Sequence, residues 1–421
     1  MISVRAAVVQ NLKSVTAFKK IPPAYTRRIL KDFQTTGVCM TKLKTYAALV
    51  DDIFGPGTAT FKTESTTSND VVGAIASTTD FEVFRKNFEE RLRRLQGAIQ
   101  LNQKISFPII NAVNGVAKLG GWEGYYAELV ALDYFLSDAE TGPGEIELDV
   151  TVPALDAIAS EFKMQNINYD LCIPSLGIVT DVKILSDKSG GILDGIFKEF
   201  RSVKGITHLT IQPEYSEDED YDVFQGHRSS LLKELIEEID TTARPPYFRS
   251  KVIEGLSYRF AWEAGVVIAE SSYDSKTHAS NHQRLLVTHA KKFSRREPTI
   301  IIFVVFPWAS ERIMLFSEMR IAQEFIHNLG SIFFDITGPS TVEARSINKN
   351  IKTSISLADV SRHLSGILLI EDKSILASDD DLIADASYIF NENAVHTLNG
   401  SKLESYLKRR NATNLINFLK T

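Results

Sequence analysis

The stretch NYDLCIPSLGIVTDVKIL, residues 168–185, decides the fold. Two runs rich in β-branched and aromatic residues flank the tetrapeptide PSLG. Pro174 and Gly177 favour a tight turn there, because proline fixes one backbone angle and glycine tolerates left-handed conformations. The pattern therefore predicts a β-hairpin. The turn also sets the register of the two strands, and the expected opposite pairs are Ile173 with Ile178, Leu171 with Thr180, and Asp170 with Asp181.

This register separates a polar face of the hairpin from an apolar face. Side chains alternate along a strand, so Asp170, Asp181 and Lys183 are predicted to share one face. The opposite face is predicted to join the core, and it consists of Tyr169, Leu171, Ile173, Ile178, Val182 and Ile184.

The polar face has the composition of a site for a divalent cation. Two carboxylates directly opposite each other on a sheet repel, and a cation between them turns that penalty into binding. Hard ions such as Mg²⁺ take carboxylate and carbonyl oxygens, and the Val182 carbonyl lies between Asp181 and Lys183. The sequence therefore predicts Mg²⁺ as the cofactor, with Mn²⁺ as a substitute. The ammonium group of Lys183 is placed to orient or help deprotonate an attacking water.

The arrangement of Asp170, a hairpin and then Asp181-Val182-Lys183 resembles the signature of the PD-(D/E)xK nuclease superfamily. Tyr169 stands where the motif's name has proline, and the second acid is aspartate where glutamate is commoner. The resemblance covers about residues 119–215. It implies a restriction-endonuclease-like mixed sheet flanked by helices, and metal-dependent hydrolysis of phosphodiester bonds.

The same resemblance implies a glutamate on the helix before the hairpin. GYYAELVALDYFL, residues 124–136, is similar to that helix, and Glu128 is its candidate metal ligand. Helical spacing places Glu128 on one face with Leu132 and Phe135, so it is expected to face inward. Glu123 and Asp133 fall on the other side and are expected to be solvated.

The chain divides into three parts. Residues 1–118 are predicted to be mainly helical, 119–222 to form the nuclease core, and 245–421 to form a second α/β domain. The helix at 190–203 and the strand at 205–212 are expected to complete the core. The fold class is therefore α/β (α+β), with the acidic stretch at 216–222 as a boundary.

A sequence pattern similar to that of the hairpin recurs in the second half of the chain. In SYRFAWEAGVVIAESS, residues 257–272, Arg259 and Glu270 have the spacing of Asp170 and Asp181, and Ser272 stands in the place of Lys183. A helix at 281–293 and a strand at 298–306 are expected to follow. The pattern suggests a degenerate copy of the fold without a metal site, although α/β proteins routinely repeat hairpin, helix and strand.

Composition and charge limit the classes of protein to which the chain can belong. The chain has 421 residues, 44% of them hydrophobic and 24% charged, which excludes a largely disordered protein. Only two cysteines are present, and no signal peptide or membrane anchor is evident, so a cytoplasmic location is expected. The net charge is −6, so the chain as a whole lacks the excess of basic residues that is usual in a nucleic-acid binder. The basic clusters at 85–94, 291–296 and 408–410 are each typical of solvated surfaces, and 291–296 is the candidate contact for a phosphate backbone.

The sequence thus predicts a Mg²⁺-dependent endonuclease that cuts DNA and acts as a homodimer. A role in restriction or defence follows from the resemblance alone. Two alternatives stay open: a nuclease that cuts RNA or is activated by a nucleotide, and a non-catalytic nucleic-acid-binding or assembly protein. A further alternative, which the sequence favours less than a nuclease, is an exposed polar hairpin without any site.

Overall fold

The structure, a computed structural model, describes most of the chain beyond the first 35 residues. The described ranges are 36–61, 70–76, 81–118, 121–137, 146–185, 188–206, 208–214, 221–262, 275–306, 319–339, 341–345, 352–375 and 383–418. Glu270 and Ser272, the key positions of the expected degenerate copy, lie outside them.

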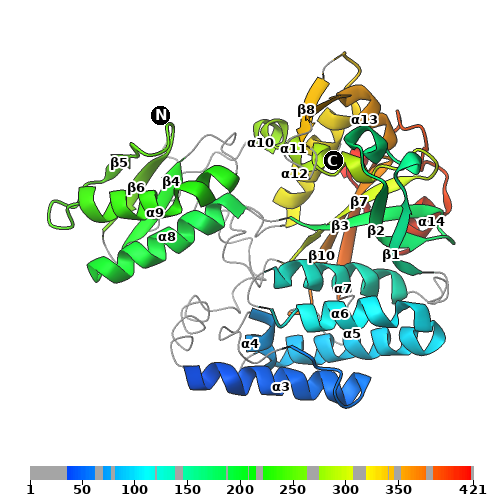
Figure 1. The fold of residues 1–421 in the computed structure, drawn as a ribbon, viewed down its shortest axis with the longest axis horizontal. Helices are drawn as coiled ribbons and strands as arrows, with labels where there is room; N and C mark the ends of the chain where they lie inside the picture. Colours follow the sequence, from blue (N-terminus) through cyan, green and yellow to red (C-terminus); the bar gives the residue numbers. More distant parts are fainter. Residues whose placement is uncertain are drawn as a thin grey trace.

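A seven-stranded mixed sheet forms the centre of the molecule, in the order β1-β2-β3-β7-β10-β11-β12 (Figure 1). Neighbouring strands β1, β2 and β3 are antiparallel, as are β10 and β11, whereas β3–β7, β7–β10 and β11–β12 are parallel. The strands are β1 (Glu147–Pro153), β2 (Asn166–Ile173), β3 (Ile178–Ile184), β7 (Thr299–Val305), β10 (Gly366–Asp372), β11 (Ala384–Phe390) and β12 (Thr413–Asn414).

The middle of the sheet is covered on both faces. Every residue of β7, TIIIFVV, is buried. Ile300 and Ile302 pack into one core and Ile301 and Phe303 into the other. A run dominated by apolar, mostly β-branched residues is typical of a parallel strand that is buried between two layers.

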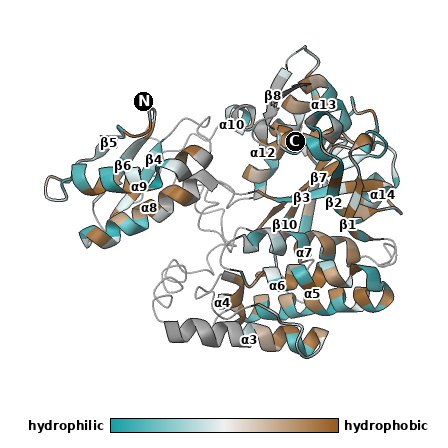
Figure 2. Cartoon of the chain, in the orientation of Figure 1, coloured by the Kyte–Doolittle hydropathy of each residue, from teal (hydrophilic) through white to brown (hydrophobic). Residues whose placement is uncertain are grey.

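One face packs against a layer of helices from the N-terminal part of the chain. Figure 1 places these helices together below the sheet, and Figure 2 shows hydrophobic and hydrophilic stripes along them. The layer comprises α3 (Thr36–Phe54), α4 (Asp70–Ala76), α5 (Glu82–Leu101), η3 (Gln103–Ile105), α6 (Ser106–Gly115) and α7 (Trp122–Leu136). The spacing of Phe84, Phe88, Leu92 and Leu95 on α5 accounts for its buried side. The helical character expected for this region holds over its described residues.

The other face packs against elements from the second half of the chain and short segments after β1. The helices are α10 (Ser275–Asn281), α11 (Arg284–Val287), η7 (Ala290–Lys292), α12 (Met319–Phe334), α13 (Leu357–His363) and α15 (Leu415–Phe418). The remaining elements around the sheet are η5 (Ala154–Asp156), η6 (Ile158–Phe162), the hairpin β8 (Thr341–Arg345) with β9 (Lys352–Ser356), and α14 (Lys402–Arg409).

A separate unit with its own core lies between β3 and α10 in the sequence, on the left of Figure 1. Its three-stranded sheet has the order β4-β6-β5. Its elements are α8 (Lys188–Lys204), β4 (Thr210–Glu214), α9 (Tyr221–Glu238), β5 (Tyr247–Arg249) and β6 (Ser257–Ala261).

This unit changes which segments complete the sheet around the hairpin. The helix and strand expected to do so are α8 and β4, but they belong to the separate unit. The strand beside β3 is β7, and the helical segment before β7 is the broken run α10–η7. The expected division of the nuclease core from residues 245–421 therefore does not separate two sheets, because β7, β10 and β11 continue the sheet of β1–β3.

The α/β fold class is confirmed. The expected second hairpin differs from the structure in its described half: β6 pairs with β4 and β5, and Arg259 forms an ion pair with Glu214. Along the described part of the chain, no helix combines the length and the apolar character needed to cross a bilayer.

Candidate metal centre

The β2–β3 hairpin has the predicted register. Ile173 lies opposite Ile178 and Leu171 opposite Thr180. The backbone pairing of β2 with β3 ends at Leu171 and Thr180. Beyond it, Oδ2 of the Asp170 side chain accepts a hydrogen bond from the Val182 amide at 2.7 Å. A side chain thus satisfies the backbone group that the next ladder bond would have used, and the Asp170 carboxylate is fixed beside β3.

The three predicted polar residues of the hairpin converge. Lys183 Nζ lies 2.8 Å from Asp181 Oδ1 and 3.6 Å from Asp170 Oδ2, and it also donates to the Val182 carbonyl at 2.9 Å. The apolar face is divided between two cores. Leu171, Ile173, Ile178 and Val182 join the core of the N-terminal helices, with Ile184 packed against it, whereas Tyr169 packs in a small separate cluster.

A second lysine, which the sequence reasoning did not assign to the site, lies at the same acids. Lys292 Nζ, at the end of η7, donates to Asp170 Oδ1 at 3.0 Å and to Asp181 Oδ1. His289, just before η7, places Nδ1 3.3 Å from Asp181 Oδ2. The two carboxylates are therefore surrounded by two ammonium groups and one imidazole.

Members of the basic cluster 291–296 form ion pairs within the protein. Three of its members have acidic partners: Lys292 binds the acid pair, Arg295 pairs with Glu161, and Arg296 Nε lies 2.7 Å from Asp156. These contacts tie the segment to the protein itself. They leave less of the cluster for the phosphate backbone than the sequence suggested.

The charges in the site shift the pKa values of the two aspartates in opposite directions. Burial, followed by repulsion from Asp181, raises the pKa of Asp170. Burial alone would also raise the pKa of Asp181, but Lys183 and Lys292 outweigh it and the net shift is downward. The two lysines thus favour the ionised form of Asp181. Burial and the two lysines lower the pKa of His289 to about 3, so its ring is neutral at physiological pH.

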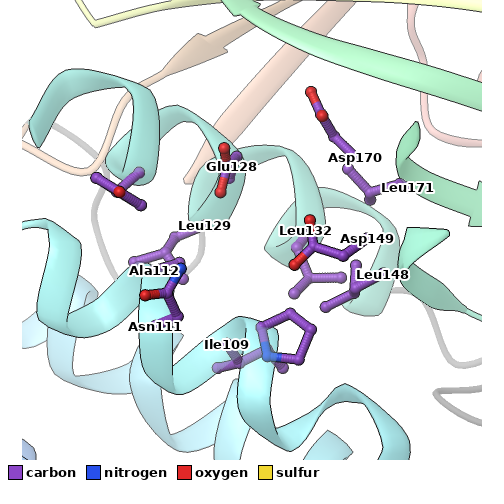
Figure 3. A pocket seen from close by; sticks show the side chains of 12 residues that line it. Ile109, Asn111, Ala112, Glu128, Leu129, Leu132, Leu148, Asp149, Asp170 and Leu171 are labelled. Atoms are coloured by element: carbon purple, nitrogen blue, oxygen red, sulfur yellow. The ribbon is translucent and has the colours of Figure 1, made fainter. Parts of the chain in front are cut away.

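Glu128 faces the same region from helix α7. It lines a pocket of about 110 Å³ together with Asp149 and Asp170, and Figure 3 shows the three carboxylates around its rim. Burial, and then repulsion from Asp170 and Asp149, raises the pKa of Glu128 to about 7. Glu128 is thus next to the hairpin through the pocket that it lines with Asp170. Its side chain makes no direct contact with Asp181 or Lys183 in the described structure.

Asp149 is a further acid that the sequence reasoning did not assign to the site. Its neighbours on β1 pair with β2, Leu148 with Leu171 and Val150 with Tyr169, so Asp149 falls at the level of Asp170. Its φ of 52° marks a local departure from the extended backbone. The strand of residues 147–153 was visible in the sequence, but its register against β2 was not.

The prediction of a solvated Asp133 on the same helix is wrong. Asp133 is 2% exposed and accepts hydrogen bonds from Arg91 and Arg94 of α5. The N-terminal helices cover that side of α7, which the helical periodicity of α7 alone does not reveal.

The donor set fits a hard divalent cation. Asp181 Oδ2 is buried and has no hydrogen-bond partner among the described residues, although His289 Nδ1 is nearby. Together with Asp170 and the Val182 carbonyl it supplies the oxygen ligands that Mg²⁺ prefers. Across the described ranges, no group of three or more histidine, cysteine, aspartate or glutamate side chains is gathered tightly enough to hold a metal. A cation here would rest on the aspartate pair and a backbone oxygen, with Glu128 reaching it directly or through water.

Comparison with family models, with curated proteins and with solved structures gives no match. The assignment of a function therefore rests on the geometry of the site.

Proposed function

We propose that the chain is a Mg²⁺-dependent nuclease that hydrolyses phosphodiester bonds. The observation that carries the proposal is the convergence of Asp170, Asp181 and Lys183 on one hairpin, with the Val182 carbonyl among them. Asp181 is 1% exposed, and Lys183 and Lys292 compensate the cost of burying its charge, so the acids and bases of the site are gathered inside the protein and not spread over a solvated surface.

The order of elements around the hairpin supports the same proposal. A helix that carries an acid, α7, packs against β3 and β7. The antiparallel strands β1–β3 follow α7 in the chain, and β7, which comes after the separate unit and the segment α10–η7, lies parallel to β3. The resemblance implied a helix, a hairpin, a further helix and a further strand, and α10–η7 and β7 stand here in place of the expected α8 and β4.

Each residue has a role that its surroundings allow. Asp170 and Asp181 would hold the metal, with the Val182 carbonyl and Glu128 completing its ligands. Lys183, held by Asp181 and the Val182 carbonyl, is placed to orient a water or take part in its deprotonation. When bound, the cation supplies electrostatic stabilisation of the charge that develops on the phosphate oxygens.

DNA as the substrate, restriction or defence as the role, and a cytoplasmic location are part of the same proposal. So is a homodimer: the described part of the chain offers one such site, and cutting both strands needs two, which an isologous C2 dimer provides. These points rest on the resemblance and on composition.

Incubation with supercoiled plasmid and Mg²⁺ tests the proposal. We expect nicked or linear product from the wild type and from Asp240→Asn, an exposed position that serves as the matched control, and none from Asp181→Asn. Sequencing of the product ends locates the cuts. Parallel reactions with single-stranded DNA and RNA separate a DNA nuclease from one that cuts RNA. Metal-independent binding of DNA without cleavage would favour the non-catalytic alternative.

A further inference from the structure

We propose that Lys292 is a built-in competitor for the divalent cation, and that the metal must displace its ammonium from between Asp170 and Asp181. This inference rests on the proposed function, because it concerns the same acid pair.

Lys292 is placed where a cation that bridges the two aspartates belongs. Its Nζ donates to Oδ1 of both Asp170 and Asp181, whereas Lys183 is hydrogen-bonded to only one of them. Its side chain is 18% exposed, so water screens these contacts only partly. The attraction of both aspartates keeps the pKa of Lys292 raised despite its burial, and the ammonium stays charged.

The two lysines already balance the charge of the two aspartates. A divalent cation that enters would add two further positive charges next to Lys183 and Lys292. The repulsion is relieved most directly if Lys292 leaves, since its ammonium occupies the position shared by both aspartates, whereas Lys183 donates to Asp181 alone of the pair. The metal must therefore overcome the interaction of Lys292 with the acids, which weakens its apparent affinity.

The displaced ammonium has a clear second use. It remains tethered to η7 beside the metal, where it can meet the phosphate oxygens of a substrate. Metal binding in this way exchanges one partner of Lys292 for another, from carboxylate to phosphate, and makes the lysine available only once the cation is in place.

Mn²⁺ binding without nucleic acid tests the proposal, measured by titration calorimetry and by the loss of the free-ion EPR signal. The variants are Lys292→Met, which keeps the apolar stem, and Lys292→Arg, which keeps the charge. Lys291→Met is the matched control, since it removes the same charge one residue away from the contact. Circular dichroism and urea unfolding establish that each variant is folded.

We expect Lys292→Met to bind Mn²⁺ about tenfold or more tightly than the wild type. Lys292→Arg and Lys291→Met should stay within about threefold of it. Equal or weaker binding by Lys292→Met overturns the inference, and if the wild type binds Mn²⁺ and Asp181→Asn does not, the proposed function still stands. If neither the wild type nor Lys292→Met binds Mn²⁺, both fail.

Discussion

Arg91 and Asp372 form an ion pair of 2.8 Å in which both side chains are fully buried, although the residues lie 281 positions apart in the chain. Arg91 also donates to Asp133 at 3.1 Å and to the Tyr126 hydroxyl at 3.0 Å, and that hydroxyl donates to Asp372 at 2.6 Å. The network fastens helices α5 and α7 to the end of β10. Removing one partner from such a network leaves the other charge buried and unpaired.

Arg91→Met should therefore lower the free energy of unfolding by about 3–5 kcal/mol. Arg93→Met is the control, because its side chain is 53% exposed and pairs with the surface acids Asp52 and Glu89. That change should leave the free energy of unfolding close to the wild-type value. Urea unfolding followed by tryptophan fluorescence measures both. Equal stabilities for the two variants would show that the buried network contributes nothing net.

Asp181→Asn should reduce cleavage by about a thousandfold or more, since it removes one of the two aspartates proposed to hold the metal. The repulsion between opposed acids suggests that losing one would stabilise the metal-free fold. The structure changes that expectation, because Asp181 balances Lys183 and Lys292. We expect the free energy of unfolding of the metal-free variant to be about 1–3 kcal/mol lower than that of the metal-free wild type. A metal-free variant more stable than the wild type would mean that acid repulsion outweighs the lysine contacts.

Lys183→Met should lower turnover by about 10²–10⁴-fold while Mn²⁺ still binds. The methionine keeps the length of the stem but cannot hold a water or a proton. Single-turnover cleavage at saturating metal, compared with Mn²⁺ affinity measured separately, distinguishes the two effects. Loss of metal binding in this variant would assign Lys183 to building the site.

Glu371 provides a prediction about pH. It lies on β10 directly opposite Asp385 of β11, and burial is the main reason that its pKa is raised. A raised folded-state pKa means that the stability it contributes is present at low pH and is lost as pH rises through that value. Glu371→Gln should thus be more stable than the wild type at about pH 8, with a smaller difference at about pH 4. Thermal unfolding at both values measures this, with the exposed Glu392→Gln as the control. A difference independent of pH would contradict the titration of Glu371.

The hairpin could be predicted from the sequence because its determinants are local. The turn residues Pro174 and Gly177 and the alternation of side chains fix the register, and the register brings Asp170 and Asp181 together. The resemblance singles out Glu128, and helical spacing only predicts which face of its helix it lies on.

The parts that the sequence did not reveal depend on contacts between distant segments. Lys292 reaches the site only because β7 pairs with β3, and Asp149 only because β1 pairs with β2 in one register. The sequence predicts that Arg91 is a solvated base, because its partner Asp372 lies 281 positions away and no neighbouring residue indicates the contact. The helix and strand after the hairpin have the right local pattern, but local pattern does not say which sheet a strand joins.

The unit formed by residues 188–262 has a consequence for the order in which the protein is made. Synthesis delivers β2, β3 and this whole unit before it delivers η7 and β7. A ribosome that has released residue 262 has therefore produced Asp170, Asp181 and Lys183, but neither the strand that seats β3 in the sheet nor Lys292. The two aspartates are thus synthesised before the residues that surround them in the folded site. A chain that ends within the unit contains the motif but lacks β7, the strand that holds β3 in the sheet.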